Sequence, residues 1–135
     1  MKTEYFDLKN KRALVSGGAS GIGSSIVEHL CEQGVEVYFF DINKNEAKKT
    51  INNIKKKKFK TPSFVECNIK NIKKYKSSIL NIIKKQGPID ILVNNASNDQ
   101  RHSLEKITEK YWDDRMAINL KHYLFAIQSV KKSMI

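Results

Sequence analysis

The feature that most constrains the fold of this chain is a glycine-rich turn near its start, residues 16–23. Its sequence is Ser-Gly-Gly-Ala-Ser-Gly-Ile-Gly, and it directly follows a short apolar run at residues 12–16. Apolar side chains at helical spacing begin within it, at Ile22, Ile26, Val27 and Leu30. Glycine lets a backbone reverse sharply and lets two elements approach closely. The segment therefore predicts a strand, a tight turn and a helix in direct succession.

The rest of the chain repeats this alternation of short β-rich runs and longer helical periods. Gly34 and Gly87 end two of the predicted helices, and Asn43 and Thr108 can cap two others. Strands are predicted at residues 12–16, 35–41, 63–67 and 89–94, and helices at 22–33, 44–57, 71–86 and 109–132. The order βαβαβαβα predicts the α/β class, with one domain over residues 1–135. We expect a Rossmann-type doubly wound parallel sheet, incomplete at four strands, with strand order 3-2-1-4.

Composition excludes several classes of protein. The 135 residues are 40% apolar and 29% charged, which is an ordinary globular balance. No run of about eighteen apolar residues is present to span a membrane. The first residues contain no apolar stretch typical of a signal peptide, so a cytoplasmic location is expected. Cys31 and Cys67 stand in apolar contexts and are expected to be buried free thiols.

The formal net charge of +11 comes almost entirely from lysine, since arginine occurs only at Arg12, Arg101 and Arg115. Nucleic-acid-binding proteins favour the forked guanidinium of arginine for contacts with phosphate and guanine. We therefore interpret the charge as solvated helix faces, with a nucleic-acid surface on the same frame as the alternative. No nucleic-acid partner, no membrane partner and no metal site are predicted.

An acidic residue at the end of the second predicted strand completes a ligand-binding pattern. Asp41 lies eighteen residues past Gly23. Glycines at such a turn let the backbone approach a pyrophosphate, and the helix start offers N–H groups and partial positive charge. The Asp41 carboxylate can accept hydrogen bonds from the adenosine ribose and repel a 2′-phosphate, so NAD is favoured over NADP. The alternatives are a purely structural β–α turn and an Asp41 that acts as an ordinary turn residue.

Three motifs, in order, resemble those of the short-chain dehydrogenase/reductase family. Ser16-Gly17-x-x-x-Gly21-x-Gly23 is similar to the family's Thr-Gly-x-x-x-Gly-x-Gly, with serine in place of threonine. The segment Asn94-Asn95-Ala96-Ser97 resembles Asn-Asn-Ala-Gly, and Asn119 matches the family's helical asparagine. Together these motifs cover essentially the whole chain.

The resemblance implies an NAD(H)-dependent oxidoreductase that acts on the CH–OH group of an alcohol or aldose. It implies that Asn119 is catalytic by holding a water in a proton relay, whereas the alternative is an asparagine that bonds backbone inside its helix. Asn68 and Ile69 would meet the adenine ring, and Asn94 and Ala96 would sit beside the cofactor ribose. The implied cofactor-binding residues are Ser16, Gly17, Ser20, Gly21, Ile22, Gly23, Asp41, Asn68, Ile69, Asn94 and Ala96.

A narrower resemblance concerns the loop Asn98-Asp99-Gln100-Arg101-His102 and the helix start that follows it. This stretch is similar to sugar 1-dehydrogenases of the xylose and arabinose type. A loop after the fourth strand lies at the carboxyl edge of a parallel sheet, where ligands bind. The resemblance implies that Asn98, Asp99, Arg101 and His102 contact a polyol substrate. The alternative is a solvated polar loop.

The family's chemistry also requires a serine and a Tyr-x-x-x-Lys pair several tens of residues beyond Asn119. Tyr5 and Lys9 have that spacing, but they precede the first strand, and we interpret the match as coincidence. We therefore expect an N-terminal half that is inactive alone and unstable or oligomeric, because its fourth strand and last helix lack packing partners. A homo-oligomer is expected for the full-length form. The alternative is a catalytically inactive dinucleotide-binding module from a truncated gene.

Overall fold

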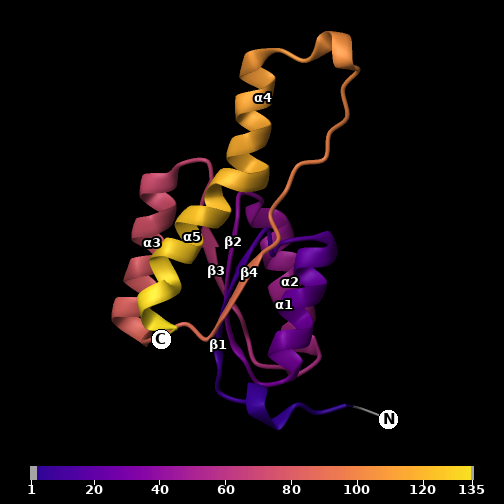
Figure 1. Ribbon diagram of the computed structural model, residues 1–135. Coiled ribbons are helices and arrows are strands. Elements are labelled where there is room, and N and C mark those ends of the chain that lie inside the picture. The colour runs from indigo at the N-terminus through magenta and orange to yellow at the C-terminus, as the bar shows by residue number, and fades with distance from the viewer. Residues whose placement is uncertain (1–2, 135) are drawn as a thin grey trace.

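The computed structural model describes residues 3–134, which form a four-stranded parallel sheet with helices on both faces (Figure 1). The strands are β1 (Arg12–Ser16), β2 (Glu36–Asp41), β3 (Ser63–Glu66) and β4 (Ile91–Asn94). They lie in the order β3-β2-β1-β4, and each neighbouring pair is parallel. The α/β class, the doubly wound sheet and the strand order 3-2-1-4 are confirmed. The predicted bounds of the first strand match β1, and those of the other three differ by one or two residues at one end.

Two hydrophobic cores lie on opposite faces of the sheet, because successive side chains of a strand point to opposite sides. Helices α1 (Gly21–Glu32) and α2 (Lys44–Lys56) cover one face, and α3 (Ile72–Gln86) and α5 (His122–Val130) cover the other (Figure 1). Val15 and Phe39 belong to the first core, whereas Leu14 and Phe40 belong to the second. Cys31 and Cys67 are buried free thiols, one in each core, as predicted. Burial raises the pKa of Cys31 to about 12, so this thiol stays protonated.

Strand β4 forms one edge of the sheet. Among residues 3–134 it pairs with β1 alone, and all four of its residues are half-buried. Its almost continuous apolar sequence is typical of a strand that is covered on both faces. The open edge therefore offers backbone hydrogen-bonding groups to a further strand.

The prediction of one continuous helix at residues 109–132 is wrong, because this segment is not a single α-helix. The segment consists of α4 (Glu109–Met116), a π-helical turn η3 (Ala117–Lys121) and α5 (His122–Val130), followed by a short 3₁₀ turn η4 (Lys131–Ser133). Helix α4 rises beyond the carboxyl edge of the sheet, while α5 packs beside α3 (Figure 1). Single π-helical turns inside longer helices are often found at functional sites. Here the turn contains Asn119.

The remaining elements are two short 3₁₀ turns, η1 (Phe6–Leu8) and η2 (Leu104–Lys106). The predicted caps are observed, since Asn43 accepts a hydrogen bond from Glu46 N–H and Thr108 accepts one from Tyr111 N–H. No helix within residues 3–134 has the length and apolar character needed to cross a membrane. The same residues contain no group of three His, Cys, Asp or Glu side chains placed to hold a metal ion.

Candidate functional site

The glycine turn closes against the loop that follows β4. Gly17 and Gly21 have φ values of +70° and +55°, in the left-handed region that favours glycine. A Cβ on Gly17 would lie 2.8 Å from Ala96 Cα, and one on Gly23 would lie 1.8 Å from the Gly17 carbonyl oxygen. Gly18, which the motif left unassigned, is needed as well, because its Cβ would lie 2.6 Å from Phe39 Cβ. The turn is therefore closed by contacts that side chains would block.

Ser16 links the glycine turn to the loop that follows β4. It is buried at the end of β1, and its Oγ accepts hydrogen bonds from Asn95 N–H and Ala96 N–H, each at 3.1 Å. The Asn95 side chain returns two bonds, from Nδ2 to the carbonyl oxygens of Ser16 at 3.1 Å and Gly17 at 3.0 Å. Asn95 was absent from the predicted site, although its place in the second motif marks it. Ser16 and Asn95 thus fix the separation of the two loops.

His122 lies next to Ser16 and is fully buried. Its Nε2 is 3.3 Å from Ser16 Oγ. Because that oxygen already accepts two backbone hydrogen bonds, its hydroxyl proton is free to donate to Nε2, which requires a neutral imidazole. Burial lowers the pKa of His122 and is the larger effect. The Ile118 carbonyl partly offsets this shift, although it forms no well-aligned hydrogen bond with Nδ1.

Asp41 combines a structural role with a position at the cavity. Its Oδ2 accepts a hydrogen bond from Ala19 N–H at 3.0 Å, and its Oδ1 accepts one from Asn43 N–H at 2.9 Å. The bond from Ala19 ties the end of β2 to the glycine turn, and the bond from Asn43 holds the turn that follows β2. A carboxylate has about four lone-pair sites, so it can accept further hydrogen bonds from a ligand. The structure thus shows a turn-stabilising role for Asp41, and its role in ligand binding stays a prediction.

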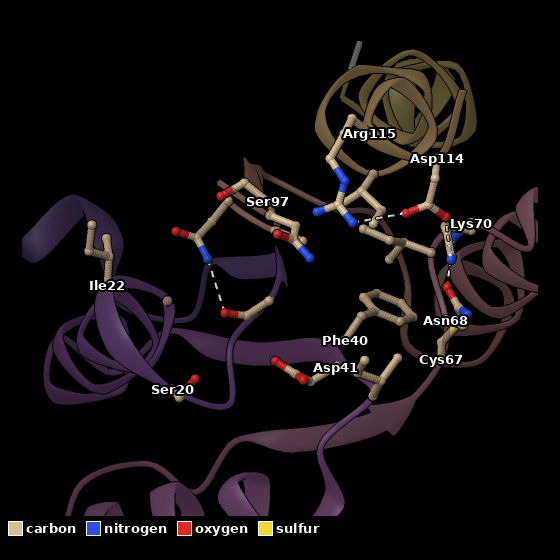
Figure 2. A pocket seen from close by; sticks show the side chains of 18 residues that line it. Ser20, Ile22, Phe40, Asp41, Cys67, Asn68, Lys70, Ser97, Asp114 and Arg115 are labelled. Atoms are coloured by element: carbon tan, nitrogen blue, oxygen red, sulfur yellow. Dashed lines mark hydrogen bonds and ion pairs between the residues drawn. The ribbon is translucent and has the colours of Figure 1, made fainter. Parts of the chain in front are cut away.

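A cavity of about 620 Å³ opens at the carboxyl edge of the sheet, between these loops and α4 (Figure 2). Its size is typical of a small-molecule or cofactor site. Nine predicted site residues line it: Gly17, Ser20, Ile22, Gly23, Asp41, Asn68, Ile69, Ala96 and Asn98. Seven others do not: Ser16, Gly21, Asn94, Asp99, Arg101, His102 and Asn119.

The start of α1 forms one wall of this cavity. Ser20 is the N-cap, but its side chain makes no capping hydrogen bond to the first turn. Backbone N–H groups of a first helical turn have no partner within the helix, and together with the helix dipole they attract an anion. Ile22, in this turn, is 76% exposed beside the opening.

Asn119 fastens the loop after β4 to the π-helical turn. Its Oδ1 accepts a hydrogen bond from Asn98 N–H at 2.8 Å, and its Nδ2 donates to the Asn98 carbonyl at 3.0 Å. The side chain therefore bonds a neighbouring loop and not its own helix. Further along, the Tyr111 hydroxyl donates to the Gln100 carbonyl at 2.6 Å, and the His102 ring stacks on Tyr111 with centroids 4.1 Å apart. The loop is thus held against α4.

Three charged residues at the cavity were not predicted. Lys70 Nζ is 2.7 Å from Asp114 Oδ1, and Asp114 Oδ2 accepts a hydrogen bond from Arg115 Nη2 at 3.2 Å. All three line the cavity, at the end that Asn68 also lines. Asp114 and Arg115 are neighbours in the sequence, and the fold brings Lys70 to them from 44 residues away.

The match to a family model decides the assignment. The model of the short chain dehydrogenase family matches residues 11–135, almost the entire chain. The chain belongs to this family. Its members are oxidoreductases that bind nicotinamide dinucleotides, and the cavity lies where the family's glycine motif and the end of β2 meet.

Several members with assigned names are similar to this chain. D-xylose 1-dehydrogenase of Caulobacter vibrioides is 37% identical over 130 residues, which are 96% of this chain and 50% of that protein. A protein of Rhizobium meliloti named "Probable galactose dehydrogenase GalD" is 33% identical over 132 residues, 98% of this chain and 52% of its own. The structure of Thermoplasma acidophilum aldohexose dehydrogenase matches with a TM-score of 0.81 at 29% identity, covering 96% of this chain and 46% of that one. The chain spans about half the length of these relatives.

We expect two of the glycines in the turn, Gly21 and Gly23, to differ in their tolerance of alanine. Gly23→Ala places a Cβ against the Gly17 carbonyl oxygen and should lower the free energy of unfolding by ~3 kcal/mol, since overpacking is costly. Gly21→Ala meets open space and should cost ~1 kcal/mol through its positive φ alone. Urea denaturation followed by circular dichroism measures both values. A larger loss for Gly21→Ala would contradict this account of the turn.

Protonation of His122 should make the stability of the fold depend on pH. The folded pKa is lowered, so between it and the unfolded value of about 6.5 the unfolded chain binds the proton and is favoured. The His122 contribution is complete above pH 6.5 and is lost as the pH falls, by roughly 1 kcal/mol between pH 7.5 and 5.5. Urea denaturation at the two pH values should show this loss in the wild-type chain.

The control variants separate His122 from the exposed histidines. His122→Gln keeps an acceptor for Ser16 but cannot titrate, so its stability should change less with pH than that of the wild type. His29→Gln, at an exposed position on α1, should retain the wild-type dependence. An unchanged pH dependence in His122→Gln would show that this imidazole is not the titrating group.

Proposed function

We propose that this chain is the dinucleotide-binding half of an NAD(H)-dependent oxidoreductase that acts on the CH–OH group of a sugar or alcohol. One observation carries the proposal. The cavity at the carboxyl edge is lined by both the glycine turn and Asp41, which suit a pyrophosphate and its adjoining ribose. The family assignment supports the same chemistry.

The residues present fit such a cofactor. The first-turn N–H groups of α1 would hold the pyrophosphate, and the Asp41 carboxylate would accept hydrogen bonds from the adenosine ribose. Asn68 and Ile69 would contact the adenine, and Ala96 and Asn94 would lie toward the second ribose. When bound, the dinucleotide supplies the hydride acceptor or donor.

The preference for NAD follows from charge. Asp41 is the acidic side chain on the cavity wall beside the glycine turn, and a 2′-phosphate on the ribose would face it. Like charges at close range repel, whereas two ribose hydroxyls can both donate to a carboxylate. We therefore infer NAD as the cofactor.

A sugar substrate is supported by the loop after β4 and by relatives named as sugar dehydrogenases. Asn98 lines the cavity, while Asp99, Arg101 and His102 are exposed along the loop that leads away from it. These polar side chains would donate and accept hydrogen bonds at a polyol. Asn119 would support the proton relay from its position beneath this loop, where it fixes the Asn98 backbone. A cytoplasmic location stays a prediction.

Replacing the Asp41 carboxylate should change the affinities for NAD and for NADP in opposite directions. Asp41→Asn retains Oδ1 as an acceptor but removes the negative charge. We expect NAD binding to weaken ~10-fold, since charged hydrogen bonds contribute more than neutral ones, and NADP binding to strengthen. Isothermal titration calorimetry of the chain with each dinucleotide measures both constants.

Glu46→Gln is the matched control, because Glu46 is a carboxylate in the first turn of α2 and does not line the cavity. It should leave both affinities within about twofold of wild type. Failure of the wild-type chain to bind NAD would refute the proposed function. An Asp41→Asn chain with unchanged preference would refute the role of the carboxylate.

We also propose a homo-oligomer for the full-length form, formed through the α4–α5 segment. Exposed apolar side chains recur there at intervals of three or four residues, which places them along one side of a helix. They are Trp112, Met116, Leu120, Leu124 and Ile127. Contiguous exposed apolar surface of this kind is typical of a protein–protein interface.

A charge within this stripe should weaken self-association. Leu124 is 55% exposed, so Leu124→Glu should leave the fold intact while placing a carboxylate in the contact. We expect light scattering to show a dimer or larger species for the wild-type chain and a smaller mass for the variant. Leu80→Glu, on α3 at 51% exposure, should retain the wild-type mass. Equal masses for all three proteins would contradict the proposed interface.

A further inference from the structure

Arg115 on α4 is an arginine with unmet hydrogen-bonding capacity at the cavity. Its Nη2 donates to Asp114, but its Nε and Nη1 are buried without a hydrogen-bond partner among residues 3–134. A guanidinium stays protonated in proteins, so it cannot relieve this cost by losing its proton. Figure 2 shows the side chain reaching from α4 into the cavity, across from Asp41. The fold formed by residues 3–134 therefore leaves two donors of this cation unpaired beside the cavity.

Contacts around Arg115 hold it at this position. Asp114, which accepts its Nη2–H bond, is also paired with Lys70, so α4 is tied to the segment that follows β3. The Arg115 Cζ lies 5.0 Å from the centroid of the Tyr111 ring, a distance typical of a cation–π contact. Tyr111 is itself fixed through its hydroxyl to Gln100. The guanidinium is therefore oriented before any ligand binds.

The surroundings indicate which part of a ligand would reach it. This end of the cavity combines the apolar side chains of Ile69 and Ile118 with the polar groups of Asn68 and Arg115. A flat heteroaromatic ring suits such walls, because apolar side chains can cover its faces and N–H donors can meet its ring nitrogens. A planar guanidinium also packs on aromatic rings more effectively than an ammonium does.

We propose that Arg115 recognises the adenine base of the bound dinucleotide, by packing its guanidinium against the purine and donating to a ring nitrogen. This inference rests on the proposed function, in which Asp41 holds the ribose that carries the base. The Arg115 side chain is 19% exposed and lines the cavity. Arg115 is thus a specificity-determining residue for the base.

The test compares two ligands that differ only in their base, ADP-glucose and UDP-glucose. Calorimetry with the full chain should show that Arg115→Met weakens ADP-glucose binding ~10-fold and UDP-glucose binding less than about threefold. Arg115→Lys keeps the charge but loses the planar group, so it should also bind ADP-glucose weakly. Lys84→Met, which removes an exposed charge from the last turn of α3, should bind both ligands as wild type does.

A second measurement separates ligand recognition from a structural role. Because two buried donors of Arg115 have no partner in the described part of the chain, the ligand-free Arg115→Met chain should melt at or above the wild-type temperature. A clear fall in that Tm would overturn the proposal, since it would make Arg115 a structural residue. Equal weakening of both ligands, or full rescue by lysine, would overturn it too, because either result indicates attraction to the pyrophosphate by charge alone.

Failure of the inference and failure of the proposed function are distinguishable. If the wild-type chain binds NAD while Arg115→Met binds ADP-glucose with wild-type affinity, the role of Arg115 is refuted and the cofactor site stands. If the wild-type chain binds neither NAD nor ADP-glucose, the dinucleotide site itself is refuted, and the base recognition that rests on it is refuted as well.

Discussion

The site depends on the close approach of two loops at the end of β1. Ser16 Oγ accepts N–H groups from Asn95 and Ala96, and the Asn95 amide bonds the carbonyls of Ser16 and Gly17. These bonds are part-buried, where hydrogen bonds are electrostatically stronger than in water. A Cβ on Gly17 would collide with Ala96, so this junction requires glycine. Parallel pairing of β1 with β4 brings the loops to one edge, and the junction then sets the width of the cavity.

The sheet was predictable because its signals are local and agree with one another. Residues of β1 and β2 are apolar on both faces, and each strand is followed by a capped or glycine-led helix. Alternating strands and helices allow few topologies once crossovers are right-handed. The burial of β4 was less predictable, because its apolar sequence does not reveal whether a further strand pairs with it. The half-buried β4 is the place where the described chain departs from what its sequence favours.

The interruption of the last helix could not be read from periodicity. A π-helical turn widens the helix locally but leaves apolar residues on both sides at roughly helical spacing, so the pattern continues through it. The turn carries Asn119, whose amide forms two hydrogen bonds with the Asn98 backbone, 21 residues away in sequence. A long-range contact of this kind leaves no trace in the local pattern. The same holds for His122, which one turn later reaches Ser16.

Asp41 shows that one residue can stabilise a turn and also line a cavity. The Asp41 carboxylate is held by two backbone N–H groups, and this anchoring is what orients it toward the cavity without a ligand. A preorganised group loses less entropy on binding than a free one. Arg115 differs, since its Nε and Nη1 donors have no hydrogen-bond partner among residues 3–134. In the proposed function, the ribose side of the site would be complete before binding, whereas the base side would be completed by the ligand.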